Sequence, residues 1–280
     1  MIFVNVHELL TNAKDYLPES TTSRLDVEIL LAYVCYVDRA FLYTNPQLVL
    51  TEGQQDQFQN LLNRRKKGEP IAYLVGSKDF WSLSLIVACG VLVPRPETEV
   101  LVETILAIYP ASESIKVADL GTGCGAIALA LATERPHWRI VATDKSPFAL
   151  KNAKKNAVKL GISQVAFYQG DWCKALTESD FDIIVSNPPY LSLEEWEKGM
   201  LELKFEPVEA LVAEKSGVGS FEAIIEEAKK FLRPQGMLIL EHGYQQGEVV
   251  RGMMEANGYN HIFTRQDLAG LERMTIGQKE

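Results

Sequence analysis

The stretch "VADLGTGCGAIALALA", residues 117–132, decides the fold that we predict for this chain. It places Gly121, Gly123 and Gly125 between an apolar segment suited to a strand and an apolar segment suited to a helix. Glycine reaches backbone angles barred to other residues and lets a ligand approach the backbone closely. In a doubly wound sheet the first such turn faces the ligand crevice. The stretch therefore predicts a ligand-binding turn, with a purely structural tight turn as the alternative.

Outward from this turn, strand and helix patterns alternate through the rest of the chain. We expect strands at 116–120, 139–143, 165–168, 182–186 and 237–241, and helices at 96–108, 126–134, 147–160, 221–232 and 246–257. Alternation of this kind predicts an α/β fold with a mostly parallel, doubly wound sheet covered by helices on both faces.

The N-terminal part has a different pattern, which is typical of helices. We expect helices at 6–17, 23–36 and 52–67. Ser23 is a candidate cap for the second helix. Thr51 and Gln54 fit a capping box at the start of the third, and Gly68 can end it in the left-handed conformation.

After Pro70, strand-like residues with turn signals at 76–79 and at Gly90 predict a β-hairpin. The chain then divides into a helical domain at 1–70, a hairpin linker at 71–95 and a ligand-binding α/β domain at 96–280. This division also suits a length of 280 residues.

Bulk properties narrow the class of protein. The net charge is −9 and the pI about 5.1, so we expect no direct nucleic-acid binding. The longest apolar run, 29–37, is shorter than the ~20 residues that cross a bilayer, and the N-terminus lacks a signal-peptide pattern. The cysteines and histidines show no metal-ligand spacing. We therefore expect a cytoplasmic monomer without a metal or a membrane anchor.

The spacing of polar residues around the glycine turn indicates the ligand. The pattern G-x-G-x-G differs from the dinucleotide fingerprint and lacks the Lys of a P-loop. Asp144 follows about 20 residues later at the end of the second expected strand, where an acid binds ribose hydroxyls. The alternative is that Asp144 or Ser146 caps the helix that begins at Pro147.

Two further positions complete a nucleoside site. Asp171 and Trp172 follow the third expected strand, where the carboxylate can bond an adenine amino group and the indole can cover the ring. Asp119, just before the glycines, can help to hold an amino group. Nucleoside features without phosphate-binding features favour S-adenosylmethionine as the cofactor.

The sequence "FDIIVSNPPYLS", residues 181–192, ends an apolar strand in a rigid corner. We expect this strand to lie beside the first, so that Asn187 reaches the crevice. The Asn187 side-chain oxygen and the Pro188 carbonyl can accept both hydrogens of a planar NH₂ group. The two prolines fix the backbone, and Tyr190 can stack on the flat substrate. The alternative is a stiff turn without chemistry.

Taken together, the motifs "DLGTGCG", "ATD", "GDW" and "VSNPPY" resemble those of class I S-adenosylmethionine-dependent methyltransferases with an Asn-Pro-Pro-Tyr motif. Four longer segments are similar to the HemK/PrmC family, the release factor glutamine methyltransferases. They are "GEPIAYLVGSKDFW" (68–81), "VLVPRPETEVLVE" (91–103), "FEPVEAL" (205–211) and "LEHGYQQG" (240–247). The resemblance covers nearly all of the chain from Gly68 onward and departs from the family pattern at 191–204.

The resemblance implies methylation of the side-chain amide nitrogen of the glutamine in the Gly-Gly-Gln motif of class I peptide chain release factors. It implies that the helical domain helps to dock the release factor, and that the segment Pro94–Glu99, with Arg95 and Glu97, lines the mouth of the site. The implied cofactor contacts are Gly121, Thr122, Gly123, Cys124, Gly125, Asp144, Trp172 and Asn187. Asp119 and Asp171 join the expected cofactor site because of their positions in the sequence. The implied substrate contacts are Asn187, Pro188, Pro189 and Tyr190, of which Asn187, Pro188 and Tyr190 act in catalysis.

Other functions stay open at this stage. An N6-adenine DNA or RNA methyltransferase would use the same corner on a flipped base, although the acidic chain has no distinct basic recognition domain. A nicotinamide-dependent dehydrogenase is disfavoured by the glycine spacing. A non-catalytic binding protein of the same fold would bind the cofactor without turnover.

Overall fold

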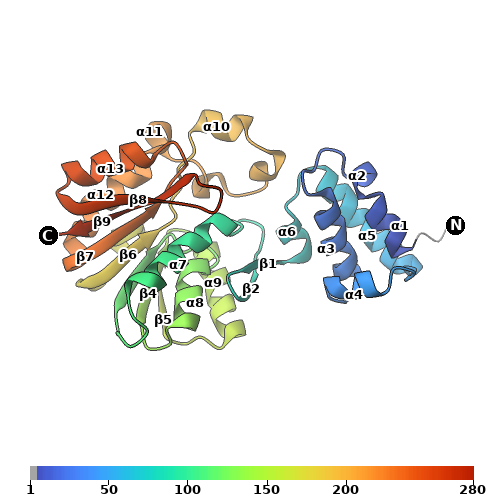
Figure 1. Cartoon of the computed structure of the whole chain (residues 1–280), viewed down its shortest axis with the longest axis horizontal. Coiled ribbons are helices and arrows are strands. Elements are labelled where there is room, and N and C mark those ends of the chain that lie inside the picture. Colours follow the sequence, from blue (N-terminus) through green and yellow to red (C-terminus); the bar gives the residue numbers. More distant parts are fainter. Residues whose placement is uncertain (1–4) are drawn as a thin grey trace. The chain divides into compact units, whose positions relative to one another are not determined.

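The computed structural model describes residues 5–280, which divide into two compact units (Figure 1). The helical unit comprises Met1–Gly76 together with Met200–Phe205. The larger unit comprises Ser77–Gly199 and Glu206–Glu280. The hairpin therefore belongs to the larger unit, while a short piece of the chain beyond the Asn-Pro-Pro-Tyr corner belongs to the helical one.

Among the described residues, six α-helices build the helical unit around one apolar core. They are α1 (Val6–Thr11), α2 (Ala13–Tyr16), α3 (Ser23–Cys35), α4 (Arg39–Thr44), α5 (Glu52–Lys66) and α6 (Ile71–Val75). The first predicted helix is interrupted at Asn12, and α4 and α6 were not predicted. The capping box of Thr51 and Gln54 is confirmed. The proposed Ser23 cap is wrong, because Thr22 precedes the helix and Ser23 is its first residue.

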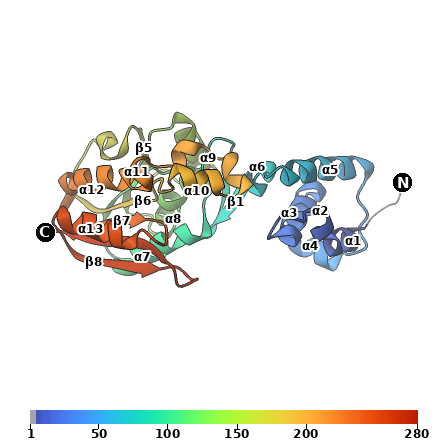
Figure 2. The same ribbon diagram turned by 90° about the horizontal axis from the view of Figure 1, so that it is seen from above.

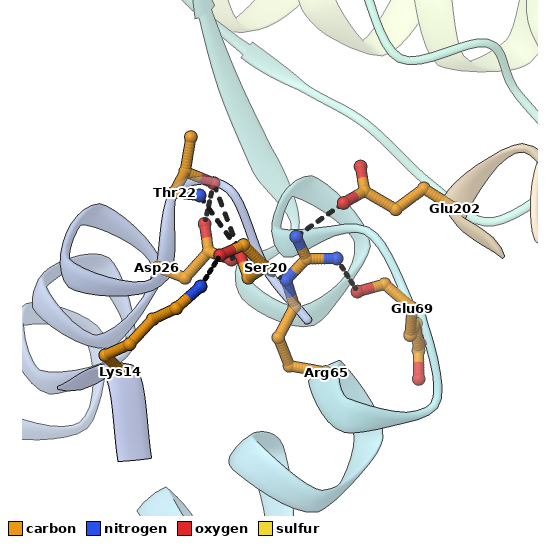
Figure 3. A network of polar contacts seen from close by, with 7 residues as sticks. All are labelled: Lys14, Ser20, Thr22, Asp26, Arg65, Glu69 and Glu202. Carbon is orange, nitrogen blue, oxygen red and sulfur yellow. Dashed lines mark hydrogen bonds and ion pairs between the residues drawn. The ribbon is translucent and has the colours of Figure 1, made fainter. Parts of the chain in front are cut away.

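A buried arginine holds the distant segment Met200–Phe205 in the helical unit (Figure 3). Arg65 of α5 donates to Asp26 at 2.7 Å and to Glu202 at 2.5 Å. Gly68 makes room beside it, because a Cβ there would lie 2.6 Å from Cβ of Leu201. Burying a guanidinium is costly unless it is paired, so this network stabilises the segment only while its carboxylates remain.

The larger unit contains two sheets. The hairpin is formed by β1 (Ser77–Phe80) and β2 (Leu83–Ile86). The main sheet has the strand order β5-β4-β3-β6-β7-β9-β8. Its strands are β3 (Lys116–Leu120), β4 (Arg139–Asp144), β5 (Val165–Gln169), β6 (Phe181–Ser186), β7 (Leu232–Glu241), β8 (Tyr259–Gln266) and β9 (Glu272–Lys279).

The helices of this unit follow the strands. They are η1 (Pro96–Thr98), α7 (Glu99–Ile108), α8 (Ala126–Glu134), α9 (Pro147–Leu160), η2 (Trp172–Ala175), α10 (Leu193–Lys198), η4 (Val208–Ala210), α11 (Glu214–Gly217), α12 (Gly219–Phe231) and α13 (Gly247–Ala256). The short helix η3 (Leu201–Lys204) lies between α10 and η4 in the chain but belongs to the helical unit. Strands β3 to β7 are parallel, and β9 runs against them, because it pairs antiparallel with both β7 and β8. The mostly parallel α/β prediction is confirmed, as is the pairing of β6 with β3; β8 and β9 were not predicted.

Alternate residues of the parallel strands pack into two cores, one on each face of the sheet. The helices that contribute to them, among them α7, α8, α12 and α13, are labelled in Figure 2. On β3, Val117 packs with α7 and α8, whereas Ala118 packs with α12 and α13. On β6, Ile183 and Ile184 divide in the same way. A strand buried on both faces is apolar throughout, which is why the sequence shows continuous apolar runs here.

The hairpin turn lies at a different place from the one predicted. Trp81, with φ +56°, and Ser82 connect the strands, while residues 77–79 pair with β2 and so form part of β1. Gly76 instead ends α6 in the left-handed conformation. In the part of the chain described, the helices are too short or too polar to span a bilayer.

Candidate active site

The carboxyl ends of β3, β4 and β6 border a cavity of about 370 Å³ in the larger unit. This volume lies within the range of small-molecule sites. The predicted site residues that line the cavity are Gly121, Gly123, Asp144, Asp171, Trp172, Asn187 and Pro189. Residues from strand ends far apart in the sequence therefore meet at one opening, as the doubly wound topology requires.

The glycine turn is shaped by backbone angles that favour glycine. Gly121, Gly123 and Gly125 have φ of +71°, +60° and +89°. Gly121 also lies against Trp172, since a Cβ there would be 3.2 Å from the indole. A Cβ at Gly125 would meet Leu129 at 2.8 Å, whereas one at Gly123 would meet no heavy atom within 4 Å. The first and third glycines thus serve packing, and the second keeps the backbone open to the cavity.

Asp144 ties the end of β4 to the glycine turn. Its Oδ2 accepts from the Gly123 N–H at 2.9 Å, and its Oδ1 accepts from the Ser146 N–H at 2.8 Å. Burial raises the pKa of the carboxyl, and these backbone donors oppose that rise. Ser146 caps α9 by accepting from Ala149, so the alternative of Asp144 as the helix cap is wrong. Each carboxylate oxygen has a second acceptor site, which leaves the ribose role as a prediction.

Asp119, Thr122 and Cys124 lie behind the glycine turn and do not line the cavity. Asp119 is 1% exposed; its Oδ2 accepts from Thr122 Oγ1 at 2.6 Å, while its Oδ1 has no hydrogen-bond partner among the residues described. Burial raises the pKa of Asp119 to about 7. Burial likewise raises the pKa of the Cys124 thiol to about 12, which indicates a packing role for this side chain.

The Asn-Pro-Pro-Tyr corner is held by side chains from three other parts of the chain. Asn187 Nδ2 donates to Thr98 Oγ1 at 3.0 Å. The Tyr190 hydroxyl lies 3.4 Å from Glu241 Oε1, and the Tyr190 carbonyl accepts from Gln246 Nε2 at 2.9 Å. The corner is thus fixed at its first and last residues.

Sequence reasoning did not single out Thr98, Glu241 or Gln246, although each lies in a segment that carries the family resemblance. In the Pro94–Glu99 segment it named Arg95 and Glu97 instead. Arg95 pairs with buried Glu206 at 2.5 Å, and Glu97 is exposed. Their predicted contact with substrate stays a prediction. The available signal was a threonine between two acids, Glu97 and Glu99. Nothing in the sequence showed that this threonine is buried.

The residues at the cavity fit S-adenosylmethionine. The open backbone at Gly123 suits a ligand that approaches closely. Beneath the turn, the buried carboxyl of Asp119 has one oxygen without a hydrogen-bond partner among the described residues, and its charged form would favour an ammonium group nearby. Asp144 and Trp172 present a carboxylate and an indole face to the same cavity. The cofactor, when bound, would supply an electrophilic methyl carbon. The protein would contribute the hydrogen-bond acceptors that hold the cofactor.

Comparison with known proteins identifies both parts of the chain. Residues 111–280 match a family model described as a methyltransferase domain, and residues 8–76 match the PrmC N-terminal domain. The release factor glutamine methyltransferase of Coxiella burnetii is 49% identical over 260 residues, which cover 93% of each chain. That of Escherichia coli is 44% identical over 269 residues, covering 96% of this chain and 97% of the relative.

Solved structures agree on the fold. A methyltransferase from Pyrococcus furiosus has a TM-score of 0.54 at 18% identity, covering 82% of this chain and 99% of the other. A Thermus thermophilus 16S rRNA methyltransferase, solved in complex with AdoMet and guanosine, has a TM-score of 0.53 at 20% identity, covering 73% of this chain and 50% of the other. The full-length similarity to the curated relatives decides the family: the chain belongs to the release factor glutamine methyltransferases.

Proposed function

We propose that this protein transfers a methyl group from S-adenosylmethionine to the side-chain amide nitrogen of the glutamine in the Gly-Gly-Gln motif of class I release factors. The observation that carries this proposal is the orientation of Asn187. Its Nδ2 is held by Thr98, so its oxygen is the end of the amide left for a substrate N–H at the cavity. The family membership supports the same substrate.

Methyl transfer to an amide requires the protein to position a weak nucleophile, the amide nitrogen. The lone pair of an amide nitrogen is delocalised, and the nitrogen must exchange one hydrogen for the methyl group. Asn187 Oδ1 and the Pro188 carbonyl accept the two N–H groups, which turns one face of the nitrogen toward the cofactor side of the cavity. Such alignment can contribute roughly 7–11 kcal/mol to lowering a barrier.

The test is methyl transfer from labelled S-adenosylmethionine, with mass spectrometry to locate the methyl group. The purified protein receives a class I release factor, the same factor with Gly-Gly-Ala in place of Gly-Gly-Gln, and duplex DNA. We expect label on the glutamine of the intact factor alone. Label on DNA adenine, with none on the factor, would favour the adenine methyltransferase alternative instead.

A further inference from the structure

The side-chain amide of Asn187 is held by Thr98, which was not among the site residues predicted from the sequence. Thr98 accepts from Asn187 Nδ2 at 3.0 Å and is only 3% exposed. It ends the turn η1 and directly precedes α7, so its backbone is fixed on both sides. The residues are 89 positions apart in the chain. Thr98 therefore contacts the corner from a separate, well-ordered element.

A buried carboxylate lies next to Thr98. Glu241 is 1% exposed and ends β7, the strand that pairs with β6 up to Ser186. The Thr98 hydroxyl lies near this carboxylate and favours its charged form, and the Tyr190 hydroxyl lies 3.4 Å from Oε1. Glu241 Oε2 has no hydrogen-bond partner within the described chain. Both ends of the corner are therefore connected to Glu241. Asn187 is connected to it by way of Thr98, and Tyr190 lies next to it.

The order of donors and acceptors in this chain of contacts decides which way the Asn187 amide points. An ionised Glu241 can only accept, so a hydrogen bond between it and the Thr98 hydroxyl requires the hydroxyl as the donor. The Thr98 oxygen then has only acceptor capacity left for Asn187, which must present its NH₂ group. A protonated Glu241 removes this constraint, because the acid can donate to Thr98 and free the hydroxyl hydrogen for the Asn187 oxygen. The charge on Glu241 therefore selects the orientation of the amide.

The surroundings of Glu241 place this change of charge near neutral pH. Burial is the largest influence and raises its pKa to about 7. Arg273 on β9 and the hydroxyls of Thr98 and Tyr190 lower the pKa, whereas Glu97 of η1 raises it. Arg273 is itself paired with Asp267, so it does not form an ion pair with Glu241 in the structure.

We propose that Thr98 and Glu241 are positioning residues that hold the Asn187 amide with its oxygen toward the substrate glutamine. The inference rests on the proposed function, since it assigns these residues a role in the same methyl transfer. Neither residue touches the cavity. Their effect passes through the orientation of Asn187, so they act on turnover rather than on cofactor binding.

The first test is the variant Thr98→Val, which keeps the volume of the side chain and removes the hydroxyl. We expect kcat for release-factor methylation to fall on the order of 100-fold, because misplacement of a reacting group costs about that much. KM for the release factor and the Kd for S-adenosylmethionine should stay near the wild-type values. Thr98→Ser restores the hydroxyl and should recover most of kcat. Thr104→Val, which deletes another buried hydroxyl from α7, is the matched control and should leave kcat unchanged.

A wild-type kcat in Thr98→Val, or a Thr98→Ser variant as slow as Thr98→Val, would overturn the proposal while leaving the proposed function intact. The proposed function fails separately, if the wild-type protein itself does not methylate the release factor. A variant that does not fold is recognised by its thermal transition, and the second test then decides the matter.

The second test is Glu241→Gln, read as a pH profile. Glutamine carries both a donor and an acceptor, so it does not enforce one orientation of the Thr98 hydroxyl. We expect the wild-type kcat to rise from about pH 6 to about pH 8 with a midpoint near the Glu241 pKa of about 7, and the variant kcat to be lower and flat over that range. A variant profile that matches the wild type would overturn the role of Glu241.

Discussion

The turn after β3 and the corner after β6 lie at the ends of neighbouring strands, yet they are built in opposite ways. The glycine turn combines three left-handed glycines with one carboxylate, Asp144, from the adjacent strand. The Asn-Pro-Pro-Tyr corner combines two prolines with side chains from η1, β7 and the segment before α13. The first region gains its shape from backbone freedom, and the second from backbone restriction. The difference matches the tasks that we propose for them, since one would hold the cofactor and the other would position the nucleophile.

The largest effect should come from breaking the corner at its first residue. Asn187→Ala removes the acceptor that orients the substrate amide, and we expect kcat to fall on the order of 1000-fold, as when a preorganised hydrogen-bonding group is lost. Single-turnover methylation of a release factor measures the chemical step. The thermal transition should change little, because Asn187 is only partly buried. Turnover near the wild-type rate would show that Asn187 does not hold the substrate.

The next effect concerns the acid that shapes the turn. Asp144→Ala removes the acceptor for the N–H groups of Gly123 and Ser146, and with them the predicted ribose contact. We expect the Kd for S-adenosylmethionine to rise about 100-fold, equivalent to about 2.7 kcal/mol. Isothermal calorimetry gives the Kd directly. Asp144→Asn is the matched comparison, because its amide oxygen retains one acceptor. Unchanged affinity in Asp144→Ala would place the ribose partner elsewhere.

The two regions also differ in how far the sequence could predict them. The glycine turn and Asp144 could be predicted, because they lie within about 25 residues of each other and the ends of neighbouring parallel strands meet at the crevice. The support of the corner could not be predicted, because Thr98 lies 89 positions from Asn187 in the chain and nothing local marks it as buried. Pairing of that kind depends on how η1 packs, which only the folded structure reveals.

The errors in the fold predicted from the sequence also have physical causes. Strand β8 lies at the edge of the sheet and is mostly exposed, so it lacks the apolar run that marked the central strands. The hairpin turn places Trp81 in a left-handed conformation that bulky residues rarely adopt, so sequence favoured the glycine nearby. The central strands were predicted well because continuous apolar burial on both faces of the sheet leaves a clear pattern.

A pair of glycine variants separates strain from packing within the turn. Both Gly123→Ala and Gly125→Ala force alanine into the left-handed region, which costs about 1–2 kcal/mol. Only the alanine at 125 also meets Leu129 at 2.8 Å, and overpacking adds about 1–3 kcal/mol. We therefore expect Gly125→Ala to lower the free energy of unfolding more than Gly123→Ala, as measured by denaturant titration. Equal losses in the two variants would mean that the core around Leu129 yields to the added methyl group.

The smallest effect is a pH dependence of cofactor binding at Asp119, the acid beneath the turn. Burial raises its pKa to about 7, so in the free protein the proton is bound below that pH. Between the ordinary pKa of 3.8 and about 7 the folded state binds more protons than the unfolded state, and this group's contribution to stability falls as pH rises. The ammonium group of a cofactor bound at the cavity, in front of the turn, would favour the charged form of this carboxylate. Affinity for S-adenosylmethionine should therefore increase as pH rises, by at most about tenfold per unit below the pKa, and level off above it.

Calorimetry between about pH 6 and about pH 8 measures this slope, and buffers of different ionisation enthalpy report the proton released on binding. The matched variant is Asp119→Asn, which keeps the shape and an acceptor for Thr122 but does not titrate. It should bind the cofactor more weakly at the upper pH and with no slope over the range. Asp144, whose pKa is also raised, is the other buried acid at the turn, so Asp144→Asn should retain the slope if Asp119 is its source. A slope that survives in Asp119→Asn and vanishes in Asp144→Asn would move the titrating contact from beneath the glycine turn to the end of β4.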